Sequence, residues 1–153
     1  MNFEEIVLND FTIVGISVET INAGGKAQQD ITVLWQRFLS ENILQQIPNK
    51  VSEDIYCVYT NYESDYKGKY TTILGCKVAS VDTSSNIFVV KEIIGGKYYK
   101  FISEGPIPES VGRTWSNIWE TDYPRRYSAD FDIYGVKSQD LISPQTETYL
   151  SIK

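Results

Sequence analysis

Three tyrosines and two carboxylates fall within nine residues, in the segment VYTNYESDY from Val58 to Tyr66. A carboxylate can act as a general base, and a tyrosine offers an apolar ring with a polar hydroxyl at its edge. If this strand-like segment stays extended, Tyr59 and Glu63 share one face and Tyr62 points the opposite way, because side chains alternate with period two. The alternative is a strand end that runs into a solvated acidic hairpin. We take Tyr59 and Glu63 as candidate pocket residues.

A second cluster is the string FDIY, from Phe131 to Tyr134. In a strand, Asp132 and Tyr134 share one face. Aspartate is a poor strand former, so its place inside an apolar strand calls for a physical reason. One alternative is an edge or end strand that leaves Asp132 in water, and another is a salt bridge to Arg125 or Arg126. The pattern alone leaves these alternatives open.

The tryptophans Trp115 and Trp119 lie one helical turn apart, so they share one face of a helix. That spacing is typical of a packed core and is also compatible with a pocket wall. Two cysteines, Cys57 and Cys76, lack the CxxC spacing of metal or redox sites, and we expect them to be buried thiols in a reducing compartment.

The chain contains no histidine. Imidazole metal ligands, Ser–His and Cys–His nucleophile pairs and histidine bases are therefore excluded, and we expect neither a metal nor a cofactor. The net charge of −6 disfavours binding to nucleic acid or to an anionic membrane. Neither a signal peptide nor a membrane-spanning apolar run is evident, so the sequence predicts a cytoplasmic location.

These side chains must be positioned by elements that repeat along the chain. Strands are expected at Phe11–Val18, 55–62 and 70–79, with a helix from Asp30 that carries Ile31, Leu34, Trp35, Phe38 and Leu39 at helical spacing. The pattern then recurs as a strand over 87–102 broken at Gly95-Gly96, a helix after Pro108, and strands at 131–134 and 146–152. We predict an α+β fold of one domain, residues 1–153, built from two β-α-β-β repeats of about 9–80 and 86–153. Two helices on one face of a common antiparallel sheet would then flank a central ligand groove.

The string VYTNYESDYKGKYTTILGCKV, followed by GGKYYKF, SNIW and RRYSADFDIY, resembles the GyrI-like/AraC effector-binding superfamily. Within it the chain is most similar to the single-domain integron-associated effector-binding proteins. The similarity covers Phe11 to Ile152, and the order and spacing of the strings make it specific. The resemblance implies the same duplicated fold.

The resemblance also implies a pocket between the two helices for drug-like, commonly cationic and lipophilic molecules. In this superfamily the pocket is aromatic, and an acidic residue forms its floor in the strand that here reads DFDIY. Many relatives have Glu at that position, where this chain has Asp132. The implied ligand-binding residues are Trp35, Tyr59, Glu63, Trp115, Trp119, Asp132 and Tyr134.

Three functions follow as expectations. The first is ligand binding without chemistry, by a stand-alone sensor or sequestering domain linked to transcription regulation. Direct DNA binding is not expected, because the duplicated fold uses all 153 residues. The second is hydrolysis of cyclopropane-containing natural products, as in some relatives, with Glu63 or Asp132 as the general base. The third is contact between an acidic surface and a protein partner such as gyrase.

Overall fold

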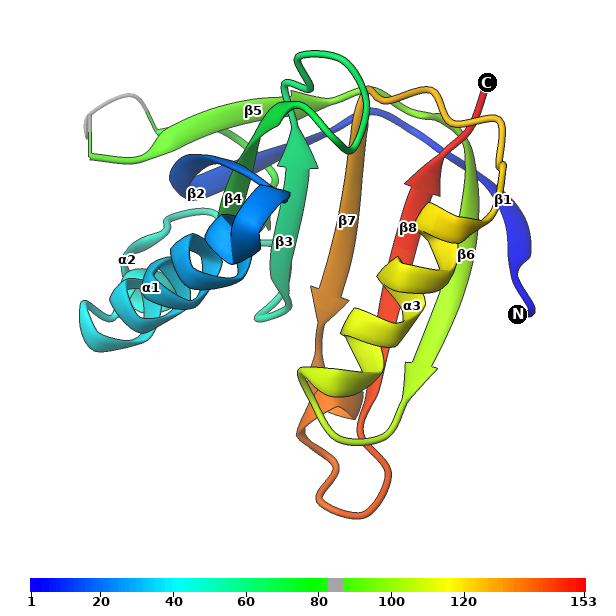
Figure 1. The fold of residues 1–153 in the computed structure, drawn as a ribbon. Helices are drawn as coiled ribbons and strands as arrows, with labels where there is room; N and C mark the ends of the chain where they lie inside the picture. Colours follow the sequence, from blue (N-terminus) through cyan, green and yellow to red (C-terminus); the bar gives the residue numbers. More distant parts are fainter. Residues whose placement is uncertain (83–86) are drawn as a thin grey trace.

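In the computed structural model, residues 1–82 and 87–153 are described, and they form one eight-stranded antiparallel sheet (Figure 1). The strand order is β1-β6-β8-β7-β3-β4-β2-β5. The strands are β1 (Glu4–Leu8), β2 (Phe11–Ile21), β3 (Ile55–Thr60), β4 (Lys69–Val78), β5 (Val89–Ile93), β6 (Gly96–Glu104), β7 (Ala129–Tyr134) and β8 (Gln145–Ser151). The helices are α1 (Lys26–Ser40), α2 (Ile43–Gln46) and α3 (Glu109–Glu120), with 3-10 turns at Ala23–Gly25 and Val136–Gln139.

The predicted α+β fold with two β-α-β-β units is confirmed. One unit is β2-α1-β3-β4 and the other is β6-α3-β7-β8, and they meet where β3 pairs with β7. Outward from this pair, each unit places its third strand and then its first: β4 and β2 on one side, β8 and β6 on the other. β5 and β1 form the two edges of the sheet. The boundary placed at about residue 86 lies outside the described residues.

The predicted strand over 87–102 is two strands, β5 and β6, which lie toward opposite edges of the sheet. β5 pairs with β2 and β6 pairs with β1. The chain turns at Gly95 and Gly96. Gly96 has φ of 126°, and a Cβ on Gly95 would lie 2.3 Å from the Leu8 carbonyl oxygen, so both positions require glycine. Strand β1 was not expected because it starts with two glutamates and has no alternating pattern.

Both long helices cover the same face of the sheet (Figure 1). α1 starts at Lys26, four residues before the predicted start, and its buried side chains include Leu34 and Phe38. Leu39, placed on the apolar stripe by its spacing, is instead 64% exposed. The buried apolar stripe of α1 is narrower than the spacing predicts, because α1 packs on the sheet along one side and borders a cleft along the other.

Under α1 and α3 lie two separate apolar clusters. Leu34 and Phe38 belong to the first, and Trp115 and Ile118 belong to the second. Tyr59 of β3 packs against both clusters, as does Tyr134 of β7. The two central strands therefore present aromatic side chains to the space between the helices. A third cluster, which includes Phe131, fills the opposite face of the sheet.

Both cysteines are buried and unbridged. Within the described residues, no group of three or more Cys, Asp or Glu side chains is arranged to hold a metal ion. Across the same residues, no helix has the length and apolar character needed to cross a membrane.

Candidate functional site

A cleft of about 1210 Å³ lies between α1 and α3 above β3 and β7. Five of the seven predicted ligand-binding residues line it: Trp35 from α1, Trp115 and Trp119 from α3, Tyr59 from β3 and Tyr134 from β7. The Trp35 and Tyr134 rings meet edge to face at 5.0 Å, and those of Tyr59 and Trp115 at 5.2 Å. Edge-to-face contacts hold aromatic side chains in defined orientations, so the cleft wall is pre-formed.

Asp132 lies beneath this wall and is completely buried. The Tyr59 hydroxyl donates a hydrogen bond to Asp132 Oδ2 at 2.7 Å, the Trp115 indole Nε1 donates to Oδ1 at 3.1 Å, and the Thr148 hydroxyl also donates to Oδ1. β7 is a central strand, so neither the edge-strand alternative nor solvation applies. Among residues 1–82 and 87–153, no Lys or Arg nitrogen forms an ion pair with Asp132. All of its bonded partners are neutral.

Burial raises the pKa of Asp132 to about 6, while hydrogen bonds from Thr148, Tyr59 and Trp115 counteract that rise. The pKa of this group is therefore higher in the folded than in the unfolded chain. Protonation of Asp132 stabilises the fold, and this contribution is complete below the unfolded value of 3.8 and is lost as the pH rises through about 6. At neutral pH the site therefore holds a buried carboxylate that has no positive partner within the described part of the chain.

Tyr59 connects Asp132 to Cys57, because the Cys57 thiol donates to the Tyr59 hydroxyl at 3.3 Å. Burial raises the pKa of Cys57 and that of Tyr59, so both groups stay protonated at neutral pH. A protonated Tyr59 remains a donor to Asp132. The arrangement stabilises a carboxylate and supplies no nucleophilic thiolate.

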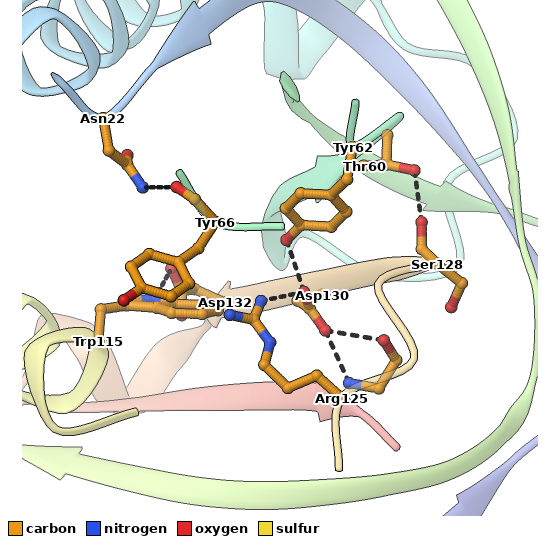
Figure 2. Close-up of polar contacts among 10 residues, drawn as sticks. Asn22, Thr60, Tyr62, Tyr66, Trp115, Arg125, Ser128, Asp130 and Asp132 are labelled. Carbon is orange, nitrogen blue, oxygen red and sulfur yellow. Dashed lines mark hydrogen bonds and ion pairs between the residues drawn. The ribbon is translucent and has the colours of Figure 1, made fainter. Parts of the chain in front are cut away.

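A second buried acid, Asp130, lies two residues before Asp132 on the same face of β7. One of its oxygens accepts hydrogen bonds from Arg125 Nη2, at 2.9 Å, and from the Tyr62 hydroxyl (Figure 2). The other oxygen accepts from the backbone N–H and the hydroxyl of Ser151. The Arg125 ion pair, considered above for Asp132, is thus made with Asp130. Sequence reasoning missed Asp130, although the period of two in ADFDIY places it beside Asp132.

Tyr62 also lines the cleft, although strand alternation placed it on the face opposite to Tyr59. β3 ends at Thr60, and Asn61 has φ of 53°, a left-handed conformation that redirects the chain. Asparagine adopts this conformation more readily than most residues, so Asn61 was the available signal for the turn.

Two of the seven predicted site residues do not line the cleft: Asp132 is buried beneath its wall, and Glu63 lies away from it. Glu63 follows the end of β3 in an exposed turn and is not among the lining residues. The continuous strand on which its assignment depended is absent between Asn61 and Glu63. The hairpin instead contributes Tyr66, whose ring stacks on Trp119 of α3 at 5.8 Å, and whose carbonyl accepts a hydrogen bond from Asn22 (Figure 2).

The site can therefore hold an apolar, partly aromatic molecule against a wall with one uncompensated carboxylate behind it. Asp132 is the group that would respond to a positive charge on that molecule. Acidic side chains of α3, Glu109 and Glu120, stand at the cleft and are exposed to solvent.

Comparison with known proteins gives a family match and a related bacterial protein. The family model of integron-associated effector binding proteins matches residues 5–152. A Bacillus subtilis (strain 168) protein named as a transcriptional regulator, YobU, is 27% identical over 159 residues, covering all of this chain and 99% of its own.

Two solved structures share the fold. One is SAV2435 bound to tetraphenylphosphonium, with a TM-score of 0.84 and 20% identity over 100% of this chain and 94% of its own. The other is an integron cassette protein from the mobile metagenome of Vibrio cholerae, with a TM-score of 0.75 and 25% identity over 99% of this chain and 95% of its own.

Proposed function

Because this chain belongs to the family of integron-associated effector binding proteins, we propose that its effector is a lipophilic organic cation held between α1 and α3. The observation that carries the proposal is the isolation of Asp132. A buried carboxylate with only neutral partners is costly, and a cation entering the cleft would compensate it.

The walls of the cleft favour the same class of ligand. A cation over the face of a tryptophan or tyrosine gains about 0.5–2 kcal/mol, and apolar contact adds about 25 cal/mol for each Å² buried. Trp35 and Tyr134 are partly buried and Trp119 is exposed, so all three offer such surfaces in the cleft. These two contributions to the binding free energy depend weakly on ligand shape, so we expect the site to accept several cations of similar size.

In the cell we propose a sensor or sequestering role linked to transcription regulation. YobU, named as a transcriptional regulator, matches this chain over its whole length. Two buried, unbridged thiols fit a reducing compartment, which supports a cytoplasmic location.

The hydrolase alternative receives less support from the site. Of the two carboxylates proposed as general base, Glu63 lies outside the cleft, and both oxygens of the buried Asp132 already accept hydrogen bonds. Contact with gyrase or another protein stays a prediction that a binding assay with the purified partner can test.

The test compares two lipophilic ions of similar shape and opposite charge by thermal unfolding. Tetraphenylphosphonium at about 100 times its dissociation constant should stabilise the protein by about 2.7 kcal/mol. Tetraphenylborate, the matched anion, should leave the melting temperature unchanged. Equal stabilisation by the two ions, or stabilisation by the anion alone, would contradict the proposed cation preference.

A further inference from the structure

The side chain of Arg125 lines the cleft but uses only part of its hydrogen-bonding capacity. It is 5% exposed, and its Nη2 group donates to Asp130 at 2.9 Å. Its Nε and Nη1 groups are buried and have no hydrogen-bond partner in the part of the chain that the structure describes. Because a guanidinium carries five N–H donors in a planar fork, the contact with Asp130 leaves several of them without an acceptor.

Buried donors of this kind are rare and call for a partner. Leaving a buried donor unsatisfied costs about 1–3 kcal/mol, and more for a charged group. The pair of Arg125 and Asp130 is neutral as a whole, so what its free N–H groups lack is an acceptor atom.

The surroundings of Arg125 hold the guanidinium in one orientation. Its Cζ lies 4.2 Å from the ring centre of Tyr127 and 5.9 Å from those of Tyr62 and Trp115. Tyr127 has φ of 57°, an unusual conformation for a bulky residue, whereas the other non-glycine residues with positive φ among those described are asparagines. A strained backbone that places a ring against the guanidinium indicates that this orientation matters to the protein.

We propose that Arg125 forms a second subsite of the cleft, which binds a carbonyl or carboxylate oxygen carried by the same ligand. This inference rests on the proposed function and narrows it: the preferred effector is an organic cation with a hydrogen-bond acceptor. Trp115 joins the two subsites, because its Nε1 donates to Asp132 and its ring borders Arg125. Because the free N–H groups are buried, ligand binding there requires a side-chain adjustment, and such adjustments are common on binding.

The arrangement accounts for a cleft that contains both signs of charge. Asp132 would interact with the positive charge of the ligand. The rings of Tyr62, Trp115 and Tyr127 already surround the positive charge of Arg125, so a second cation is not expected among them. A purely cationic ligand would leave the Arg125 donors unpaired. A ligand with an acceptor satisfies both subsites together.

The test uses three phosphonium probes of nearly equal size in titration calorimetry at about pH 7.5, above the pKa of Asp132. They are pentyltriphenylphosphonium, (4-carboxybutyl)triphenylphosphonium and the methyl ester of the latter. The wild-type protein should bind at least one acceptor probe about fivefold or more tightly than the pentyl probe. The ester shows whether a neutral carbonyl suffices or a carboxylate is required.

The matched variant is Arg125→Met combined with Asp130→Asn, which removes both charges together and leaves no buried charge alone. In this variant the ratio of dissociation constants for the pentyl and acceptor probes should fall to within about twofold of one. If the double variant does not fold, Arg125→Lys retains the ion pair but lacks the planar fork, and the ratio should again fall.

Equal binding of all three probes by the wild type, or an acceptor preference that survives in the folded variants, would overturn the Arg125 subsite and leave the proposed function in place. Failure of every probe to bind would overturn the proposed function and this inference with it.

Discussion

Asp130 and Asp132 are neighbours on one face of β7, and both are completely buried, yet their surroundings differ in one respect. Asp130 forms an ion pair with Arg125 and accepts hydrogen bonds from Tyr62 and Ser151. Asp132 accepts hydrogen bonds from neutral groups alone. One carboxylate has its countercharge within the fold, and the other has none within ion-pair distance among the described residues.

The difference assigns the two acids different roles. The buried ion pair of Asp130 and Arg125 has a structural role, because Asp130 holds both Arg125 and Ser151, the last residue of β8. A buried carboxylate with neutral donors keeps its charge at the expense of stability, and such groups are concentrated at functional sites. On a single strand, we therefore expect Asp130 to contribute to stability and Asp132 to cation binding.

The largest effect is expected from Asp130→Asn, because this change leaves Arg125 charged, buried and unpaired. We expect a loss of about 3–5 kcal/mol in the free energy of unfolding, measured by urea denaturation. The matched variant Asp132→Asn removes a lone buried charge and should cost far less stability. Equal destabilisation by the two variants would show that the acids do not differ as described.

Asp132→Asn should instead act on binding. We expect its dissociation constant for tetraphenylphosphonium to rise about tenfold or more, because the countercharge is gone while the cleft keeps its shape. Titration calorimetry measures the change, and circular dichroism checks that the fold is intact. Glu63→Gln removes the same charge from outside the cleft and serves as the control, with affinity expected to stay within about twofold of wild type. If the Asp132→Asn variant bound tetraphenylphosphonium as tightly as the wild type, Asp132 would not be part of the binding site.

Trp119→Ala should have the smallest effect. Trp119 is 37% exposed and stacks on Tyr66, so the variant loses one aromatic surface of the cleft and little of the core. We expect affinity for tetraphenylphosphonium to fall about threefold to tenfold, in line with the loss of one cation–π contact, with under about 1 kcal/mol lost in stability. Leu39→Ala, on the outer side of α1, is the control. Loss of the fold in Trp119→Ala would show that this ring belongs to the core.

The fold could be predicted from the sequence because its signals are local. The apolar spacing of Leu34 and Phe38 marks α1, and β-branched runs mark the long strands. What could not be predicted depends on a few backbone positions. The left-handed Asn61 ends β3 and brings Tyr62 to the cleft, while Gly95 and Gly96 send β5 and β6 to opposite sides of the sheet.

The candidate site was partly predictable for the same reason. Periodicity placed Asp132 and Tyr134 on one face, and the resemblance added Trp35 and the α3 tryptophans, all of which the structure brings together around the cleft. Which arginine meets which aspartate is a matter of three-dimensional packing, and no spacing in the sequence distinguishes Asp130 from Asp132 as the partner of Arg125. The exposed position of Glu63 likewise follows from a turn that the strand pattern concealed.

The most direct test of the central claim is the pH dependence of cation binding. Because burial raises the pKa of Asp132 to about 6, the carboxylate is mostly protonated at about pH 5 and ionised at about pH 7.5. A cation that needs the ionised form should bind wild-type protein about tenfold more tightly at the higher pH, and Asp132→Asn should show no such change. Calorimetric titrations with tetraphenylphosphonium at both pH values measure this. A wild-type affinity that stays constant between them would contradict the claim that Asp132 is the countercharge of the bound cation.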